Sequence, residues 1–348
     1  TDLSDLVGSW ELLVAGDVVG SGVLGHDTGK TLVVPPGSTV ELALPYEVPD
    51  TADVLVTIRW TQRRATVWAP KGHLVAWDQL ALRQPAAPAT PSRSTTPQIG
   101  AVAAPRAPLA PIFARDGWPE LSLFRSPIDN DGFKLLPDLG RRIGVGGDGL
   151  GHWIDAGIDQ RPADDLVEHE HVVEHSDDGS QAHAHTVVVP DHLDDVARVG
   201  VTFQLPPGFD RLRYYGRGPL ENYPDRNRGA VLGIWESDVD EPPYLVPQEF
   251  GLRTDCRWFE FIDSSSGAVV RLDVLDPISM HVSATRFTTE DLYTAGHETD
   301  LRPRRRLVVH VDVAHRGVGT GSCGPDVLDR YRITPGTYRF TYRITSGS

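Results

Sequence analysis

The stretch Thr337-Tyr338-Arg339-Phe340-Thr341-Tyr342-Arg343-Ile344 decides the fold class of this chain. Its apolar residues alternate with threonine and arginine, so an extended backbone places the two tyrosines, the phenylalanine and the isoleucine on one face. Such a period of two is typical of a β-strand with one face in a hydrophobic core and the other in water. We therefore predict a strand over these residues.

Similar alternation recurs at Val54–Trp60, Ala268–Val274 and Leu307–Val313, whereas helical periodicity is nearly absent. Many short strands separated by glycine- and proline-containing turns are typical of β-sandwiches and barrels. The predicted fold class is therefore all-β. The turn signals lie at residues 36–37, 178–179, 207–208 and 335–336.

The composition is that of a globular protein with an acidic surface. The 348 residues are 40% hydrophobic, and their formal net charge is -15. Negative charge of this size repels the phosphates of nucleic acid and anionic lipid, so neither is an expected partner. No apolar run has the length of a membrane span, and no signal peptide is recognisable.

The two cysteines, Cys256 and Cys323, are too few for a disulfide framework, and a reducing cytoplasm fits them best. The chain starts at Thr1, and its only methionine is Met280. We therefore expect a piece of a longer protein.

One change in composition divides the chain. Residues 84–115 are dense in proline and alanine and show no strand pattern. Such a segment predicts an extended linker, here between a small β domain (1–83) and a large one (116–348).

Two aspartates flank an asparagine in the segment Arg125-Ser126-Pro127-Ile128-Asp129-Asn130-Asp131-Gly132. On an extended backbone Asp129 and Asp131 point the same way, which suits Ca²⁺ ligands or the carboxyl pair of a retaining glycosidase. The same residue types also form turns in which side chains bond nearby backbone N–H groups. We favour the turn.

A second polar cluster lies in the loop Tyr214–Arg226, which holds two glycines and two prolines. Aromatic rings beside amides and carboxylates suit a sugar site, because rings stack on pyranose faces and polar groups bond hydroxyls. In the alternative that we favour, Glu221, Asn222 and Asp225 satisfy backbone groups and Arg226 inside a buried loop.

Five histidines lie between residues 169 and 185, and imidazoles two residues apart on a strand can share a metal ion. A two-residue hairpin loop at Asp178-Gly179 would place Glu174 and Val172 opposite His183 and His185. The histidines would then not converge unless the loop is longer, and a solvated surface hairpin is the favoured interpretation. The five are His169, His171, His175, His183 and His185.

The glycine-rich loop Gly317–Pro325 joins two predicted strands and contains Cys323. A catalytic thiol needs an activating base and electropositive surroundings, and only His315 is close in sequence. A structural loop is therefore the expected role.

Taken together, these segments resemble the last two domains of the large β-galactosidases of glycoside hydrolase family 2, lac type. The matching blocks follow the family's order and cover nearly the whole chain. They are Ala65–Trp77 in the small domain, then Arg125–Asp131, Tyr215–Arg226, Glu249–Asp255, His297 and Gly317–Pro325.

The resemblance implies an immunoglobulin-like sandwich over residues 1–83, incomplete at its N-terminus, and a large antiparallel supersandwich like that of galactose mutarotase over 116–348. It also implies a separate (β/α)₈ barrel that carries the catalytic glutamates and the Mg²⁺ and Na⁺ ligands. No eight-fold strand–helix alternation occurs here, so neither catalytic residues nor cofactors are expected in this chain. The implied role is a non-catalytic part of a homo-oligomeric retaining enzyme that hydrolyses β-D-galactosides such as lactose.

By the same resemblance, one loop of the last domain lines the mouth of the substrate pocket on the aglycone side. The family's tryptophan on that loop aligns with Cys323, and a thiol cannot stack on a sugar ring as an indole does. The candidate substrate-binding residues are Cys323, Ser322 and Asp326.

The alternative function is a stand-alone carbohydrate-binding or mutarotase-like protein. Mutarotation needs a His/Glu acid–base pair in a sugar pocket. His281, His297 and His310 are available, but no spacing singles out a pair. The start at Thr1 and the incomplete small domain favour the β-galactosidase part.

Overall fold

The computed structural model describes residues 3–24, 32, 34–51, 53–84, 118–136, 149–319 and 326–347. Their regular elements are mostly antiparallel strands, which confirms the all-β prediction. The chain divides into two compact units, residues 1–87 with 232–234 and the remainder. The segment predicted as a Pro/Ala-rich linker lies outside the described residues from position 85 onward. None of the described helices has the length and apolar character needed to cross a membrane.

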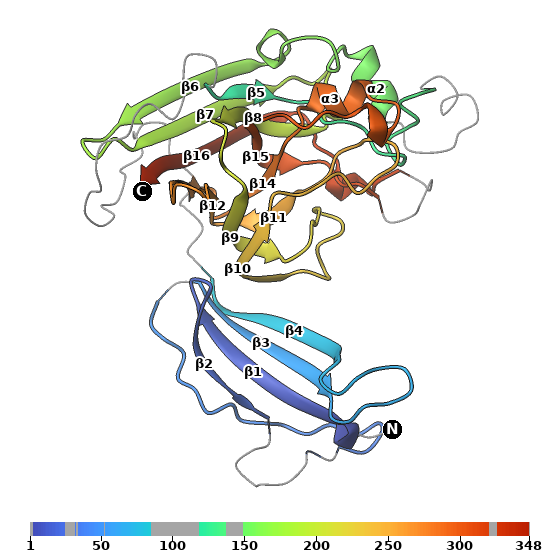
Figure 1. Cartoon of the computed structure of the whole chain (residues 1–348), viewed down its shortest axis with the longest axis vertical. Helices are drawn as coiled ribbons and strands as arrows, with labels where there is room; N and C mark the ends of the chain where they lie inside the picture. Colours follow the sequence, from blue (N-terminus) through green and yellow to red (C-terminus); the bar gives the residue numbers. More distant parts are fainter. Residues whose placement is uncertain are drawn as a thin grey trace. The chain divides into compact units, whose positions relative to one another are not determined.

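The first unit contains a four-stranded antiparallel sheet in the order β2-β1-β3-β4 (Figure 1, blue to cyan). Trp10, Val54 and Val56 form the centre of its core, and Leu44 and Tyr46 from the irregular segment 34–51 pack against them. Its elements are η1 (Leu3–Asp5), β1 (Leu6–Val14), β2 (Asp17–Val23), β3 (Val54–Gln62) and β4 (Leu74–Arg83).

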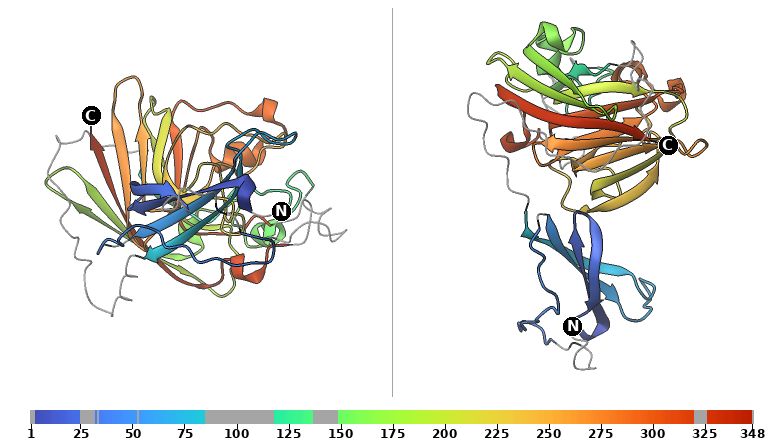
Figure 2. Two further views of the ribbon diagram at one scale, coloured as in Figure 1. Left: turned by 90° about the horizontal axis from the view of Figure 1, so that it is seen from below. Right: turned by 90° about the vertical axis from the view of Figure 1, so that its left-hand side faces the viewer.

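The second unit is a sandwich of two antiparallel sheets (Figure 2). The seven-stranded sheet runs in the order β10 (Val231–Asp238), β9 (Arg211–Gly218), β12 (Trp258–Ile262), β13 (Val269–Asp276), β16 (Gly336–Gly347), β7 (Gln181–Val189) and β6 (Glu168–His175). The five-stranded sheet runs in the order β11 (Arg253–Cys256), β14 (Met280–Thr285), β15 (Leu307–His315), β8 (Arg198–Leu205) and β5 (Glu120–Ser122). Short helical segments connect the strands: α2 (Gly149–Asp155), η3 (Ala163–Asp165), α3 (Thr289–Thr294), η4 (Glu298–Asp300) and η5 (Asp329–Tyr331).

A hydrophobic cluster joins the inner faces of these two sheets. On β16 the side chains of Phe340, Tyr342 and Ile344 are at most 1% exposed, as the alternation of that segment predicts. Leu307 and Val309 of β15 meet them from the other sheet and are fully buried. Burial of each such side chain contributes about 1.5–3 kcal/mol to folding, so the period-two pattern determines which face of each strand turns inward.

The predicted register of the β6–β7 hairpin is wrong by one residue. His175 pairs with Gln181 and His171 with His185, because the loop has three residues rather than two. Ser176 donates its N–H to the carbonyl of Ser180, and Gly179 adopts a positive φ of 81° that closes the turn. A type I turn followed by a left-handed glycine is the usual three-residue hairpin loop. A shift of one residue moves every side chain to the opposite face, so the histidines of the two strands come together.

Candidate functional site

The candidate substrate-binding residues lie on the loop that leaves β15 and returns at η5. Cys323 and Ser322 lie outside the described residues, and Asp326 is the first described residue after them. The structure therefore describes the two stems of this loop, residues 316–319 before it and residues 326–332 after it.

Asp326 holds the second stem through both oxygens of its carboxylate. Oδ1 accepts from Arg316 Nη2 at 2.6 Å and from the backbone N–H of Val327 at 2.7 Å, and Oδ2 accepts from Arg332 Nη2 at 2.7 Å. Burial opposes the ionised form, but the charge of Arg316 and its hydrogen bond outweigh this and lower the pKa of Asp326. A carboxylate offers about four acceptor positions, so Oδ2 retains capacity for one further donor.

Arg316 is the centre of a buried ionic network beneath the loop. Its side chain is fully buried and contacts the carboxylates of Asp131 at 3.0 Å, Asp195 at 2.9 Å and Asp326 at 2.6 Å. Arg125, also fully buried, pairs with Asp131 from the other side at 2.7 Å. Positive and negative groups alternate along this network, so each buried charge has a partner of opposite sign.

The same network reaches the first stem. Arg125 Nη2 donates to the carbonyl of Gly317 at 3.2 Å, and Asn130 Nδ2 donates to the carbonyl of Val318 at 2.9 Å. The segment 125–132 therefore supports the first stem by hydrogen bonds, and it does not offer a free pair of carboxyl groups. Asp131 Oδ2 accepts the backbone N–H of Ile128 at 2.9 Å, which confirms the turn interpretation.

The carboxylate of Asp225, a residue of the second predicted cluster, holds the first stem by accepting hydrogen bonds from the backbone of that stem. Its two oxygens accept the N–H groups of Val318 at 3.0 Å and Gly319 at 2.6 Å. A Cβ on Gly317 would lie 2.6 Å from Asp225 Oδ2, so only glycine permits this approach. Gly319 has a φ of 78°, in the left-handed region that favours glycine.

The other polar residues of the loop 214–226 bond protein groups, as the favoured interpretation predicts. Glu221 accepts from Tyr244 Oη at 2.6 Å and from the N–H of Gly251 at 2.7 Å. Asn222 is 2% exposed; its amide donates to the carbonyl of Arg217 and accepts the N–H of Thr254. These side chains hold the loop in place by bonding protein groups, but the loop is not buried as a whole, since Leu220 is 77% exposed.

A second buried ionic cluster lies nearby on β8 and β15. Arg198 Nη2 is 2.9 Å from Glu249 Oε1, and Arg198 Nε is 3.8 Å from Asp312 Oδ2. Burial opposes ionisation of Glu249, but Arg198 dominates and holds the pKa of that carboxyl well below its usual range. At Asp312 the effect of burial is larger than the opposing effect of Arg198, and it raises the pKa of Asp312 to about 7. Glu249 is therefore ionised at neutral pH, whereas Asp312 is about half protonated near pH 7.

Of the three histidines considered for a mutarotase-like site, His297 has a structural partner and His310 is buried, whereas His281 on β14 is half-buried. His297 is the N-cap of η4 and accepts the N–H of Thr299. His310 is 7% exposed, and burial holds its pKa well below the usual value. His315, the neighbour of the glycine-rich loop, is buried and its Nδ1 bonds the carbonyl of Arg316 at 2.8 Å.

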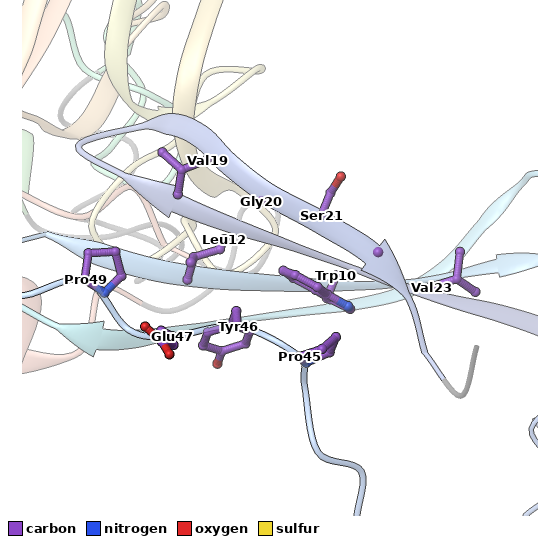
Figure 3. A pocket seen from close by; sticks show the side chains of 11 residues that line it. Trp10, Leu12, Val19, Gly20, Ser21, Val23, Pro45, Tyr46, Glu47 and Pro49 are labelled. Atoms are coloured by element: carbon purple, nitrogen blue, oxygen red, sulfur yellow. The ribbon is translucent and has the colours of Figure 1, made fainter. Parts of the chain in front are cut away.

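The first unit carries an open groove of about 780 Å³ beside β1 and β2 (Figure 3). Trp10 and Tyr46 line it, and their ring centroids lie 5.4 Å apart. Trp10 is only 5% exposed, and a Cβ on Gly22 would lie 2.8 Å from its indole nitrogen. The indole is thus covered by the strand and is not free to stack on a ligand.

Sequence reasoning missed Arg316, Asp195 and Arg332 in this site. Charged side chains are expected at the surface, and a buried network of this kind is spread over residues 125–332. The signal that was available is Arg316 itself, a charged residue that directly precedes the glycine-rich stem.

Comparisons with known proteins agree with this arrangement of segments. The family model described as "Beta galactosidase small chain" matches residues 110–344, and the model described as "Beta-galactosidase, domain 4" matches residues 1–83. Among curated relatives, the β-galactosidase of Arthrobacter sp. (strain B7) is 27% identical over 99% of this chain and 38% of its own length. That of Vibrio vulnificus (strain CMCP6) is 25% identical over 98% of this chain and 36% of its own length.

A third relative, the β-galactosidase of Kluyveromyces lactis, is 32% identical over 43% of this chain and 14% of its own length. The chain thus spans less than two fifths of the curated relatives that it matches end to end. Matched by the small-chain model over most of its second unit and by the domain-4 model over its first, the chain belongs to the β-galactosidase small-chain family.

Proposed function

We propose that this chain serves as a non-catalytic part of a retaining β-galactosidase that hydrolyses terminal β-D-galactosides such as lactose. Its role is to support the catalytic barrel and to place residues 320–325 at the mouth of the substrate pocket. Cys323, Ser322 and Asp326 are the proposed contacts to the substrate, on the aglycone side.

The observation that carries this proposal is the clamp on both stems of the loop. Asp225 and Asn130 hold residues 318 and 319, and Arg316 holds Asp326, all through contacts of 2.6–3.0 Å. A binding loop contributes most when its supporting residues fix its position before the ligand arrives. A loop with only a connecting role would not need hydrogen bonds that hold its first stem and an ion pair with a buried arginine that holds its second.

Three further features of the proposal concern the complete enzyme. Mg²⁺ and Na⁺ would be bound by the barrel, which this chain does not contribute. Copies of the enzyme would assemble into a homo-oligomer. A cytoplasmic location is supported by the low cysteine content, with only two cysteines among 348 residues.

The test is hydrolysis of a chromogenic β-galactoside by this chain alone and by its mixture with a barrel-bearing fragment of the same enzyme. We expect no activity from the chain alone and activity on mixing. Hydrolysis by the repurified chain alone would contradict the proposal.

A matched pair of variants then tests the loop in the active mixture. Asp326→Asn weakens the pairing with Arg316, and a displacement of the loop near 1 Å lowers kcat/KM by about ten- to a hundred-fold. Asp329→Asn is the control, because Asp329 lies three residues away and its side chain is fully exposed. Equal kcat/KM in the two variants would remove Asp326 and its loop from the substrate pocket.

A further inference from the structure

Four of the five histidines predicted to diverge instead gather on one face of the β6–β7 hairpin. His183 and His185 stand on β7, are 0% and 2% exposed, and stack on Tyr342 and Phe340 of β16. His171 of β6 stacks on His185 with ring centroids 4.0 Å apart. The cluster therefore lies on the core-facing side of the seven-stranded sheet, at its β6 edge.

Ring nitrogens of this cluster point at one another. His171 Nε2 lies 3.0 Å from His183 Nδ1, and His169 Nε2 lies 3.0 Å from His185 Nδ1. One ligand nitrogen from each of His171, His183 and His185 can be chosen so that all three lie within 4.8 Å of one another. Two imidazole nitrogens bound to one tetrahedral zinc ion at about 2.0–2.1 Å are separated by about 3.3 Å, so the present spacing needs only a small adjustment.

The hydrogen bonds assign a lone pair to His185. Asp164 Oδ1 lies 2.7 Å from His169 Nδ1, so that nitrogen carries the proton and His169 Nε2 accepts. His185 Nδ1 must then donate to His169, and His185 Nε2 is left as a buried acceptor. Within the part of the chain that the structure describes, His185 Nε2 has no hydrogen-bond partner. A buried nitrogen lone pair without a partner is costly unless a proton donor or a metal ion satisfies it.

We propose that His171, His183 and His185 form a binding site for a divalent transition-metal ion that prefers imidazole nitrogen, with Zn²⁺ as the expected occupant. When the ion binds, the proton between His171 Nε2 and His183 Nδ1 moves to the other ring nitrogen of the imidazole that carries it, so three neutral imidazoles hold the ion without net release of a proton. The carboxylate of Asp164 orients His169, which in turn holds His185, in the manner of the carboxylate–histidine pairs that surround zinc sites. This site is independent of the proposed β-galactosidase function.

The surroundings favour neutral imidazoles, the form that binds metal. Burial, together with the neighbouring histidines, lowers the pKa of His183 to about 3 and that of His185 to about 2. Burial also lowers the pKa of His171, against a small opposing effect of Asp164. The three ligands therefore bind as neutral imidazoles, and no proton has to be removed from them near neutral pH.

Trp118 gives the site an entrance and a reporter. Its ring centroid lies 5.9 Å from that of His171 and 5.5 Å from that of His183, and its side chain is 42% exposed. His171 is only half-buried, so an ion reaches the cluster beside these two rings. A paramagnetic ion such as Cu²⁺ bound there would quench the fluorescence of Trp118.

The first experiment is equilibrium dialysis of the 348-residue chain against Zn²⁺, with Co²⁺ as a spectroscopic substitute. We expect one equivalent of Zn²⁺, no net release of protons near pH 7, and the visible Co²⁺ bands of a tetrahedral site. His171→Gln should weaken Zn²⁺ binding at least tenfold, and Asp164→Asn should weaken it about tenfold by releasing His169. His192→Gln, at an exposed histidine outside the cluster, is the matched control and should bind as the parent does.

Failure of the parent chain to bind Zn²⁺, or equal binding by the His171→Gln and His192→Gln variants, would overturn the proposal. Both altered positions of the test variants are at least partly exposed, so loss of folding is not expected, and thermal melting checks this. Cu²⁺ quenching that persists in Trp118→Phe but disappears in His171→Gln still supports the site, whereas quenching unaffected by His171→Gln contradicts it.

Discussion

Replacing Arg316 by methionine isolates the central charge of the network beneath the loop. The guanidinium is fully buried and lies 2.6–3.0 Å from three carboxylates. At an effective dielectric constant of about 20, one such pair at 3 Å is worth about 5 kcal/mol before desolvation. Removing one partner of a buried pair costs about 3–5 kcal/mol net, because the remaining charge has lost its compensation. With three carboxylates left behind, we expect the upper end of this range.

The stability lost on replacing Arg316 by methionine should become smaller as the pH falls. Arg316 lowers the pKa of Asp326, so the stability from this pair is present above the ordinary aspartate pKa and is lost as pH falls through the lowered value. In the Arg316→Met variant Asp326 lacks the charge that lowers its pKa, so its carboxylate takes up a proton at higher pH than in the parent. The free energy of unfolding of the variant should therefore approach that of the parent in acid.

Urea unfolding followed by tryptophan fluorescence measures this effect, since the guanidinium lies 5.8 Å from the ring of Trp153. Arg332→Met is the matched control. Arg332 also contacts Asp326, but its side chain is 33% exposed, and such a pair contributes about 0–1 kcal/mol. A loss below about 1 kcal/mol in Arg316→Met, or equal losses in the two variants, would refute the reasoning.

Three other changes test separate parts of the second unit. Burial raises the pKa of Asp312 to about 7. The stability that its protonated carboxyl contributes is therefore full below about pH 4, is lost as pH rises through 7, and is of the order of 4 kcal/mol. Asp312→Asn should remove this pH dependence of stability, and an unchanged pH profile of urea unfolding would contradict this. Gly319→Ala forces a Cβ to 2.6 Å from Asn130 Nδ2 at a φ of 78° and should cost about 1–3 kcal/mol, measured by thermal melting against Gly267→Ala, which has open space around it but a similar φ. Phe261→Ala removes a fully buried ring and should cost about 3–5 kcal/mol, and a loss under about 1 kcal/mol in calorimetry would mean that the sandwich core is not packed as described.

The strands could be predicted because burial imposes a period of two that is local in sequence. The segment 337–344 shows this, since its alternation matches the burial of Phe340, Tyr342 and Ile344. The hairpin register could not be predicted, because one residue more or less in the turn reverses the faces and the loop 176–180 admits both lengths. This difference of one residue in loop length decides whether the hairpin is solvated or carries a cluster of histidines.

The candidate site was predictable only in pieces. The turn at Asp131 and the hydrogen-bonded loop around Glu221 follow from residue types with known turn chemistry. The meeting of Asp131 and Asp195 at Arg316 depends on packing among segments up to 185 positions apart, which no local pattern reports. Cys323 and Ser322 remain predictions from family resemblance.

Among the described residues, the side chains of Asp225, Asn130 and Arg316 hold the two stems of the loop. Substitutions within positions 320–325 leave every one of these anchors in place. Changes at these positions therefore alter the side chains that the loop offers to a ligand, but they do not remove the contacts that hold its stems. Libraries randomised at 320–325 should consequently retain a large fraction of folded members, and they would test the proposed effect of this segment on aglycone preference.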